Sequence, residues 1–160
     1  MSDERQIRGA IVQELGIATR YALEIANDEL RRAGVDPGEY GPVSFIGVLQ
    51  PVTRTRLAAA TGERRTTQRD SIRRLLDRGH LREVPNPRDG RSTLLELTPA
   101  GQAIFDRGAP AFRRALQRMD EALDGRLFEY EETVRRVRVA LQSLAGDEER
   151  PPEVQAPRSV

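Results

Sequence analysis

Apolar residues near the start of the chain recur at helical spacing. Between residues 7 and 33 they fall three or four positions apart and share one stripe of a single long helix; they are Ile7, Ile11, Leu15, Ala18, Ala22 and Ile25. Gly34 supplies a helix stop, and the Asp-Pro-Gly sequence at 36–38 predicts a loop. A helix this long carries more apolar surface than a small domain usually needs. The stripe therefore packs either on its own domain or on a partner chain.

The sequence next predicts three shorter helices. Residues 43–50 are apolar, and we interpret them as a helix, although their β-branched residues also permit a strand. Residues 54–61 predict a second short helix that Gly62 ends, and residues 65–78 predict a third that ends at Gly79. Two short helices joined by a tight glycine-containing turn indicate a helix-turn-helix.

Two extended segments follow the third short helix. Residues 81–84 and 93–97 have strand character, and the segment 85–91 between them holds two prolines and an Asp-Gly pair. The prolines exclude a helix there, and Asp-Gly is a strong turn signal. The sequence therefore predicts a β-hairpin with a long tip, and the tip carries Arg88 and Arg91.

The last third of the chain predicts two helices and a tail. Thr98 is a suitable N-cap, and Pro99 a suitable first residue, for a helix that ends near residue 123. Residues 128–145 carry another apolar stripe, and the tail 146–160 is polar and proline-rich, so we expect it to be disordered. The predicted fold class is mainly α with a small β-hairpin wing: a winged helix-turn-helix with helices on both sides.

The residue types that the chain lacks exclude several kinds of site. Among 160 residues there is no cysteine and one histidine, His80, which excludes disulfides, thiolate zinc sites and cysteine catalysis. The sequence has no nucleophile elbow, metal-spaced cluster or phosphate-binding glycine loop, so we expect neither an enzyme nor a bound cofactor or metal. No apolar run approaches the roughly 20 residues of a membrane span, and the N-terminus lacks the apolar core of a secretory signal. We therefore expect a cytoplasmic protein with no membrane partner.

Charge is unevenly distributed, although the net charge is only +1. Residues 53–92 carry 11 arginines against 5 acidic residues, a net charge of +6, whereas the segments before and after carry −3 and −2. All the positive charge comes from arginine, since the chain has no lysine. A basic block between acidic flanks is typical of a module that meets phosphates, although an arginine-rich solvated surface gives the same pattern.

The arginines of this block gather on the two elements with which a winged helix contacts DNA. An α-helix fits the major groove and reaches base edges with its first turns, and a thin arginine-bearing loop suits the minor groove. The predicted DNA-binding residues are Arg64, Arg65, Thr66, Thr67, Arg69 and Arg73 on the helix and Arg88 and Arg91 on the hairpin tip. A winged helix that binds a protein partner would carry the same arginines as surface charge, and this alternative stays open.

The sequence around the hairpin resembles a known signature. Asp89-Gly90-Arg91, five further residues and then Leu97-Thr98-Pro99-Ala100-Gly101 are similar to the wing signature of the MarR family of multiple-antibiotic-resistance regulators. Residues 57–62 look like the first element of its helix-turn-helix, and residues 75–79 look like the end of its recognition helix. By these motifs the resemblance covers about residues 40–123, and by layout alone it covers the terminal helices.

The resemblance implies a dimeric regulator of double-stranded DNA. Members of the family are typically obligate homodimers that repress from palindromic operators, and many release DNA when a small, often aromatic, effector binds. By position, residues 64–73 are the major-groove reader, Arg91 is the minor-groove arginine, and Asp89 orients the wing through a salt bridge. The implied regions are an N-terminal dimerisation helix and loop (1–39), the winged helix-turn-helix (40–98), C-terminal dimerisation helices (99–145) and the tail (146–160).

Some polar residues depart from the family pattern. The family usually has apolar residues that lock its two helices together where this chain has Thr61, Glu63, Gln68 and Ser71. A buried polar group without a partner is costly, so either these residues pair with one another, or the helices are reoriented, or DNA binding has weakened. The alternative function is therefore a winged-helix protein-interaction module that has lost specific DNA recognition.

Two further expectations concern burial. His80 is expected to be partly buried at the base of the hairpin rather than to act as a ligand or a pH sensor. Five aromatic residues are expected in the core, with an effector pocket as the alternative; they are Tyr21, Tyr40, Phe45, Phe105 and Phe112.

Overall fold

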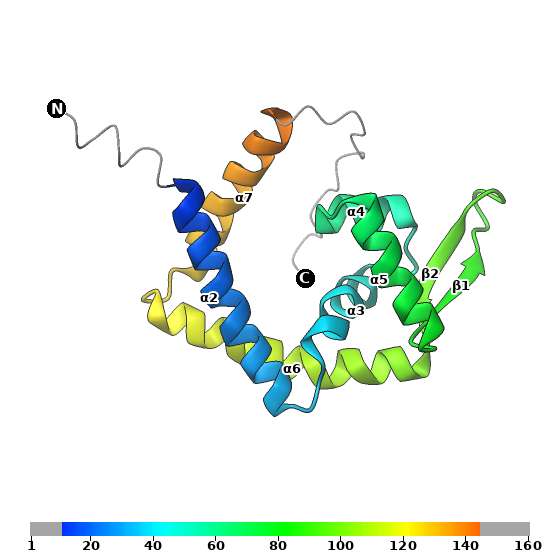
Figure 1. Cartoon of the computed structure of the whole chain (residues 1–160), viewed down its shortest axis with the longest axis horizontal. Helices are drawn as coiled ribbons and strands as arrows, with labels where there is room; N and C mark the ends of the chain where they lie inside the picture. The colour runs from blue at the N-terminus through cyan, green and yellow to red at the C-terminus, as the bar shows by residue number, and fades with distance from the viewer. Residues whose placement is uncertain (1–10, 145–160) are drawn as a thin grey trace.

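The computed structural model describes residues 11–144 as a winged helix-turn-helix beside an arm of long helices (Figure 1). In chain order the elements are α2 (Ile11–Arg32), α3 (Pro37–Leu49), α4 (Arg54–Thr61), α5 (Arg65–Asp77), β1 (Leu81–Pro85), β2 (Thr93–Leu97), α6 (Pro99–Ala122) and α7 (Leu127–Leu144). The predicted fold class is confirmed. The tail 146–160 and the first turn of the predicted N-terminal helix lie outside the described residues.

The start of α3 differs from the sequence prediction. The loop predicted at residues 36–38 is wrong, because these residues begin the helix. The Asp36 carboxylate accepts a hydrogen bond from the Gly38 N–H at 2.9 Å, which makes Asp36 the N-cap, and Pro37 is the first helical residue. Both residue types favour these positions, since the aspartate satisfies a free N–H and proline has none to satisfy. The segment 43–50 is helical through Leu49, as predicted, and is not a strand.

The helix-turn-helix forms where the sequence predicts it. Thr53 Oγ1 accepts a hydrogen bond from the Arg56 N–H at 3.2 Å and so caps α4. Gly62 follows α4 with a φ of 66°, a left-handed conformation that glycine adopts without strain. Ile72 and Leu75 of α5 are buried in the core, so the opposite side of α5 faces solvent.

The hairpin is attached to the segment that precedes α4. Its two strands pair antiparallel, from Leu81 with Leu97 to Pro85 with Thr93. Val52 and Leu95 exchange two backbone hydrogen bonds of 3.1 and 2.8 Å, which add a short third extended segment. The core lies between α3, α5, this bridge and the near half of α6; its largest fully buried side chains are Ile46, Ile72, Leu95, Val43 and Val52.

Helix α6 begins at the hairpin and runs past the winged helix into the arm (Figure 1). The Thr98 N–H donates to the His80 carbonyl at 3.1 Å and so holds the start of α6 at the end of α5. A Cβ atom at Gly101 would overlap that same carbonyl oxygen. A Cβ atom at Gly108 would overlap the ring of Tyr40. Only glycine at these two positions lets α6 lie this close to the winged helix.

A cluster around Glu29 joins α2 to the far half of α6. The Glu29 carboxylate accepts hydrogen bonds from Arg114 Nε at 3.2 Å, Arg118 Nη1 at 3.1 Å and Arg32 Nη1 at 2.7 Å. The Glu29 side chain is only 9% exposed. The hydrogen bond from Arg114 first, then that from Arg118 and the charge of Arg32, hold the pKa of the Glu29 carboxyl below its usual value, although burial opposes this. One nearly buried carboxylate therefore fixes two long helices against each other.

We expect Gly108→Ala to lower the free energy of unfolding by about 1–3 kcal/mol, because the added methyl overlaps the buried Tyr40 ring. Urea denaturation followed by circular dichroism measures the change. Gly41→Ala is the matched control, since Gly41 is helical and exposed and an added Cβ there meets no atom within 4 Å. Equal losses for the two variants would contradict the close approach of α6.

The Glu29 cluster predicts how stability depends on pH. Because the pKa of folded Glu29 lies below its usual 4.5, the cluster stabilises the fold above that pH, and this contribution is lost as the pH falls through the lowered value. We expect Glu29→Gln to lower Tm at neutral pH and to flatten the fall of Tm in the acid range. Calorimetry across that range measures both, with the exposed Glu24→Gln on the same helix as control. Parallel acid profiles for wild type and Glu29→Gln would overturn the prediction.

Candidate nucleic-acid interface

The start of α5 is a basic and exposed surface. The predicted DNA-binding residues there all face solvent; they are Arg64, Arg65, Thr66, Thr67 and Arg69. Arg64 is the N-cap without a side-chain cap hydrogen bond, and the first turn of α5 contains no acidic residue. A helix N-terminus carries partial positive charge and free N–H groups that attract phosphate. The backbone and the arginines therefore favour the same anionic partner.

Arg73 lies further along the same exposed side of α5. Its side chain is 80% exposed, and its Nε lies 3.8 Å from a carboxylate oxygen of Asp77. An exposed pair at this distance contributes little, so Arg73 can turn to a phosphate instead. Asp70 is also exposed, between Arg69 and Arg73 in sequence, and its carboxylate reduces the positive potential of this surface.

The polar residues between α4 and α5 are largely satisfied by local hydrogen bonds. Thr61 Oγ1 donates to the Leu57 carbonyl at 3.1 Å and accepts from the Glu63 N–H at 3.2 Å, so it closes α4 and shapes the turn. Glu63 itself is exposed. Ser71 is buried, and its Oγ accepts a hydrogen bond from the Arg74 guanidinium at 3.3 Å.

Gln68 is the exception among these polar residues. It is only 6% exposed, and its Nε2 has no hydrogen-bond partner within the described part of the chain. Of the four polar residues, Thr61 and Ser71 are therefore paired locally, Glu63 is exposed to solvent, and Gln68 keeps one unpaired amide in the interior.

Side chains at the hairpin tip hold the backbone of both arginines. Asn86 Oδ1 accepts from the Arg88 N–H at 3.0 Å, and Asp89 Oδ1 accepts from the Arg91 N–H at 3.1 Å. Both arginine side chains extend into solvent, and Figure 1 shows the hairpin projecting outward beside α5. The resemblance implies a salt bridge for Asp89, but among residues 11–144 its carboxylate takes part in no ion pair. A role of Asp89 in orienting the wing stays a prediction.

A carboxylate at the base of the hairpin links it to α4. Glu83 Oε1 accepts a hydrogen bond from Arg54 Nη2 at 2.8 Å and another from Thr93 Oγ1 at 2.9 Å. These bonds, that of Arg54 first, hold the pKa of the Glu83 carboxyl below its usual value. We call Arg54, Glu83 and Thr93 the wing pin. The sequence indicates only the contact between Glu83 and Thr93, because the hairpin register places these two residues on one face of neighbouring strands.

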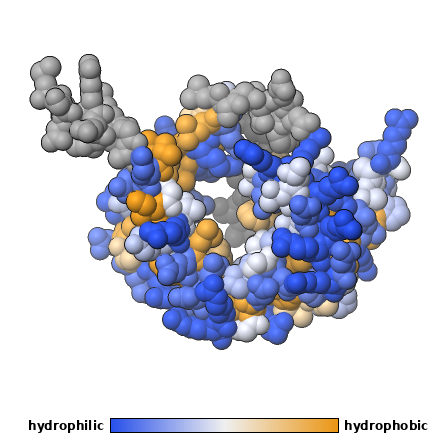
Figure 2. Space-filling model, viewed as in Figure 1, coloured by the Kyte–Doolittle hydropathy of each residue, from blue (hydrophilic) through white to orange (hydrophobic). Residues whose placement is uncertain are grey.

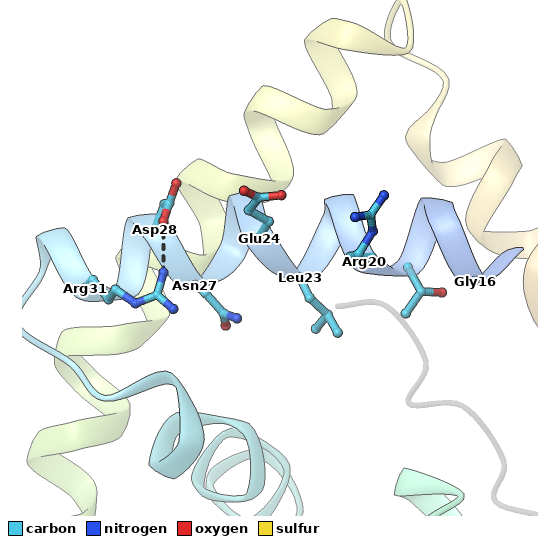
Figure 3. Close-up of a pocket in the computed structure, with 8 residues that line it drawn as sticks. Gly16, Arg20, Leu23, Glu24, Asn27, Asp28 and Arg31 are labelled. Carbon is cyan, nitrogen blue, oxygen red and sulfur yellow. Dashed lines mark hydrogen bonds and ion pairs between the residues drawn. The ribbon is translucent and has the colours of Figure 1, made fainter. Parts of the chain in front are cut away.

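Two hollows are candidates for an effector site. The larger, of about 570 Å³, is a groove whose lining residues all belong to α2, among them Arg20, Leu23 and Asn27 (Figure 3). Because one helix supplies the whole lining, this groove cannot enclose a ligand within a single chain. The second, of about 450 Å³, is lined by α3, α6 and the connection from α5 to β1, and includes Glu39 and His80.

His80 is partly buried at the base of the hairpin, as predicted. Its side chain is 20% exposed, and Nδ1 lies 3.8 Å from Glu39 Oε1, while Glu39 is paired with Arg78. Nδ1 is buried and has no hydrogen-bond partner among the described residues.

The aromatic residues divide between the core and the surface. Tyr40 is buried, with its ring centroid 5.9 Å from that of Phe112, and Phe105 packs against the core. Tyr21, Phe45 and Phe112 are exposed within the chain, so the core prediction is wrong for these three. None of the five predicted aromatic residues lines either of the two hollows.

The arm exposes many large apolar side chains. They include Ile11, Val12, Ile17, Tyr21 and Leu23 of α2, Phe112 and Leu116 of α6, and Phe128, Val134, Val139 and Leu141 of α7. No residue of α7 whose burial is described is buried. Figure 2 shows hydrophobic patches on the arm, whereas the winged helix is mainly hydrophilic. Monomers seldom expose so much apolar surface, and large patches of this kind are typical of interaction surfaces.

The described residues show neither a metal site nor a membrane span. Between residues 11 and 144 no group of three or more histidine, cysteine, aspartate or glutamate residues could hold a metal ion. No helix in that part of the chain is long and apolar enough to cross a membrane.

Known structures share this fold. No protein-family model and no curated protein matches the sequence. The chain is similar to MarR from E. coli, with 18% identity over 79% of this chain and 96% of that chain and a TM-score of 0.62. It is similar to PcaV from Streptomyces coelicolor in complex with its natural ligand, with 23% identity, 88% and 98% coverage and a TM-score of 0.67. It is also similar to MOSR from M. tuberculosis in complex with DNA, with 22% identity, 84% and 95% coverage and a TM-score of 0.64.

The resemblance found in the sequence is thereby confirmed at the level of the fold. These structural neighbours are MarR-family transcriptional regulators, and the chain has their winged-helix fold over most of its length. The neighbours are regulators rather than enzymes.

We expect Gln68→Met to raise the free energy of unfolding by about 1 kcal/mol, because it removes a buried unpaired amide and keeps the side-chain length. Chemical denaturation measures it. Gln102→Met is the matched control, since Gln102 is hydrogen-bonded to Gln50 and Asp106 and should lose stability by the same replacement. A loss of stability at Gln68 would show that its amide has a partner, such as a bound water.

Proposed function

We propose that the chain is a sequence-specific DNA-binding transcription regulator of the MarR type that acts as a homodimer. The observation that carries this proposal is the pairing of two exposed basic elements on one winged helix. The start of α5 presents Arg64 to Arg69 without an acidic residue in its first turn, and the hairpin tip presents Arg88 and Arg91. The helix is suited to the major groove and the tip to the minor groove.

The apolar surface of the arm supports a homodimer. Most of the large exposed apolar residues lie on α2, the far half of α6 and α7, which are the helices outside the winged helix, whereas α3 exposes Phe45 and Val48. A second copy of the same chain would cover this surface by two-fold symmetry. Two recognition helices would then meet successive major grooves about 34 Å apart, as a palindromic site requires.

The finer proposal is that the dimer is a repressor that a small aromatic effector releases from DNA. The similar structure of PcaV holds its natural ligand, and that of MOSR holds DNA, which supports a fold able to bind both kinds of partner. Effector binding would act by changing the separation of the two recognition helices. A duplex-binding assay with and without a panel of small aromatic acids tests this part.

The main test is selection of duplex DNA from a random pool, followed by fluorescence anisotropy at two salt concentrations. We expect an inverted repeat to be enriched and binding to weaken steeply with salt, because neutralised phosphates release counterions. Arg69→Ala and Arg91→Ala should each weaken binding by roughly ten-fold or more, the loss of one good base contact. Arg126→Ala, an exposed arginine outside the winged helix, is the control and should bind as wild type does.

The second candidate function is a winged-helix protein-interaction module that has lost specific DNA recognition. The exposed carboxylate of Asp70 among the predicted DNA-contacting residues favours it. If the selection enriches no sequence, and Arg69→Ala and Arg91→Ala match wild type, this second function replaces the first.

A further inference from the structure

Glu83 Oε1 accepts one hydrogen bond from α4, which precedes α5, and another from strand β2 of the hairpin, which follows α5. Arg54 is the first residue of α4, whereas Glu83 lies on β1 and Thr93 on β2. The bonds of 2.8 and 2.9 Å therefore tie the first helix of the helix-turn-helix to both strands of the wing. The contact between Arg54 and Glu83 is the only ion pair between α4 and the hairpin among the described residues.

The wing pin lies where the two elements are already attached. Val52 and Leu95 exchange backbone hydrogen bonds two residues before Arg54, and Thr53 caps α4. The side chains of Arg54 and Glu83 are 42% and 37% exposed, and the hydrogen bond from Thr93 Oγ1 restrains the Glu83 carboxylate as well. Leu81, Leu95 and Leu97 anchor the base of the hairpin in the core, whereas no strand residue nearer the tip than Leu95 is buried. The wing pin adds a side-chain contact between α4 and both strands at the point where the hairpin leaves the core.

We infer that Glu83 is a positioning residue that sets the angle of the wing relative to the helix-turn-helix, so that the hairpin tip meets the minor groove when α5 occupies the major groove. The inference rests on the proposed function. The tip acts as a lever: Arg88 lies five residues beyond Glu83, about 16 Å in extended chain. A rotation of roughly 10° at the pin moves the tip by about 3 Å, the length of a hydrogen bond.

A competing role for the same residues makes the opposite prediction. The first helix of a helix-turn-helix crosses the DNA backbone, so a phosphate could draw Arg54 away from Glu83. Glu83 would then compete with DNA, and removing its charge would tighten binding to every duplex. The hydrogen bond from Thr93 argues against this role, because it keeps the carboxylate in place between the two strands.

The test compares Glu83→Gln with Glu96→Gln. Both replacements remove one carboxylate from the hairpin, but Glu96 pairs with Arg82 across the strands and does not reach α4. We expect Glu83→Gln to weaken binding to the selected repeat by about five-fold or more with no loss on random duplex, which a general loss of structure would not do. We expect Glu96→Gln to keep the wild-type ratio of the affinity for the selected repeat to the affinity for random duplex. Tighter binding of Glu83→Gln to both duplexes, or equal ratios for the two variants, would overturn the inference.

A second measurement does not depend on DNA. Amide hydrogen exchange of the full-length free protein at Val52 and Leu95 reports opening between the hairpin and the helix-turn-helix. We expect exchange there to be at least about five-fold faster in Glu83→Gln than in Glu96→Gln. Unchanged exchange would show that Glu83 does not hold the joint. If exchange is faster in Glu83→Gln but the wild-type protein binds no duplex, Glu83 does hold the hairpin against α4, and the proposed function is wrong.

Discussion

The close approach of α6 to the winged helix is the constraint on which the rest of the structure depends. Gly101 and Gly108 leave room for the His80 carbonyl and the Tyr40 ring, and Thr98 bonds the start of α6 to the end of α5. The same helix then reaches the Glu29 cluster on α2. The exposed surface of α5 is therefore set relative to the apolar arm by direct packing along one helix. In a dimer built on that arm, the same packing would set the separation of the two recognition helices.

The polar interior of the helix-turn-helix is compatible with this arrangement. Thr61 and Ser71 are hydrogen-bonded locally, so their departure from an apolar pattern requires no reorientation of α4 and α5. Gln68 is the one buried side chain there with an unpaired atom in the described chain. Positive charge is concentrated on the solvent side of α5 and at the hairpin tip, where no core packing depends on it. The buried side of α5 thus serves stability, and its opposite side carries the proposed DNA contacts.

Local sequence signals, such as helix caps and turn residues, predicted most of the helices and strands, but they could not predict contacts between residues far apart in the sequence. Thr53 and Thr98 mark the starts of helices because their side chains accept hydrogen bonds from backbone N–H groups three residues later. The Asp-Gly pair marks the turn of the hairpin in the same local way. The same reasoning failed at residues 36–38, since aspartate followed by proline suits a helix start as well as a loop. The apolar stripes on α2 and α7 were visible in the sequence, but periodicity does not say whether the surface that covers them belongs to the same chain. The link from Arg54 to Glu83 spans 29 residues, and no local pattern signals it.

The most direct test of the account is the dependence of binding on the spacing of the two half-sites. Analytical ultracentrifugation and anisotropy would compare the selected repeat with a variant that has half a helical turn, about 5 base pairs, inserted between its halves. The account predicts two chains on the selected repeat and a loss of about 100-fold or more on the variant, because the second half-site turns to the opposite face of the duplex. One chain per duplex, or an affinity that ignores the insertion, would contradict it.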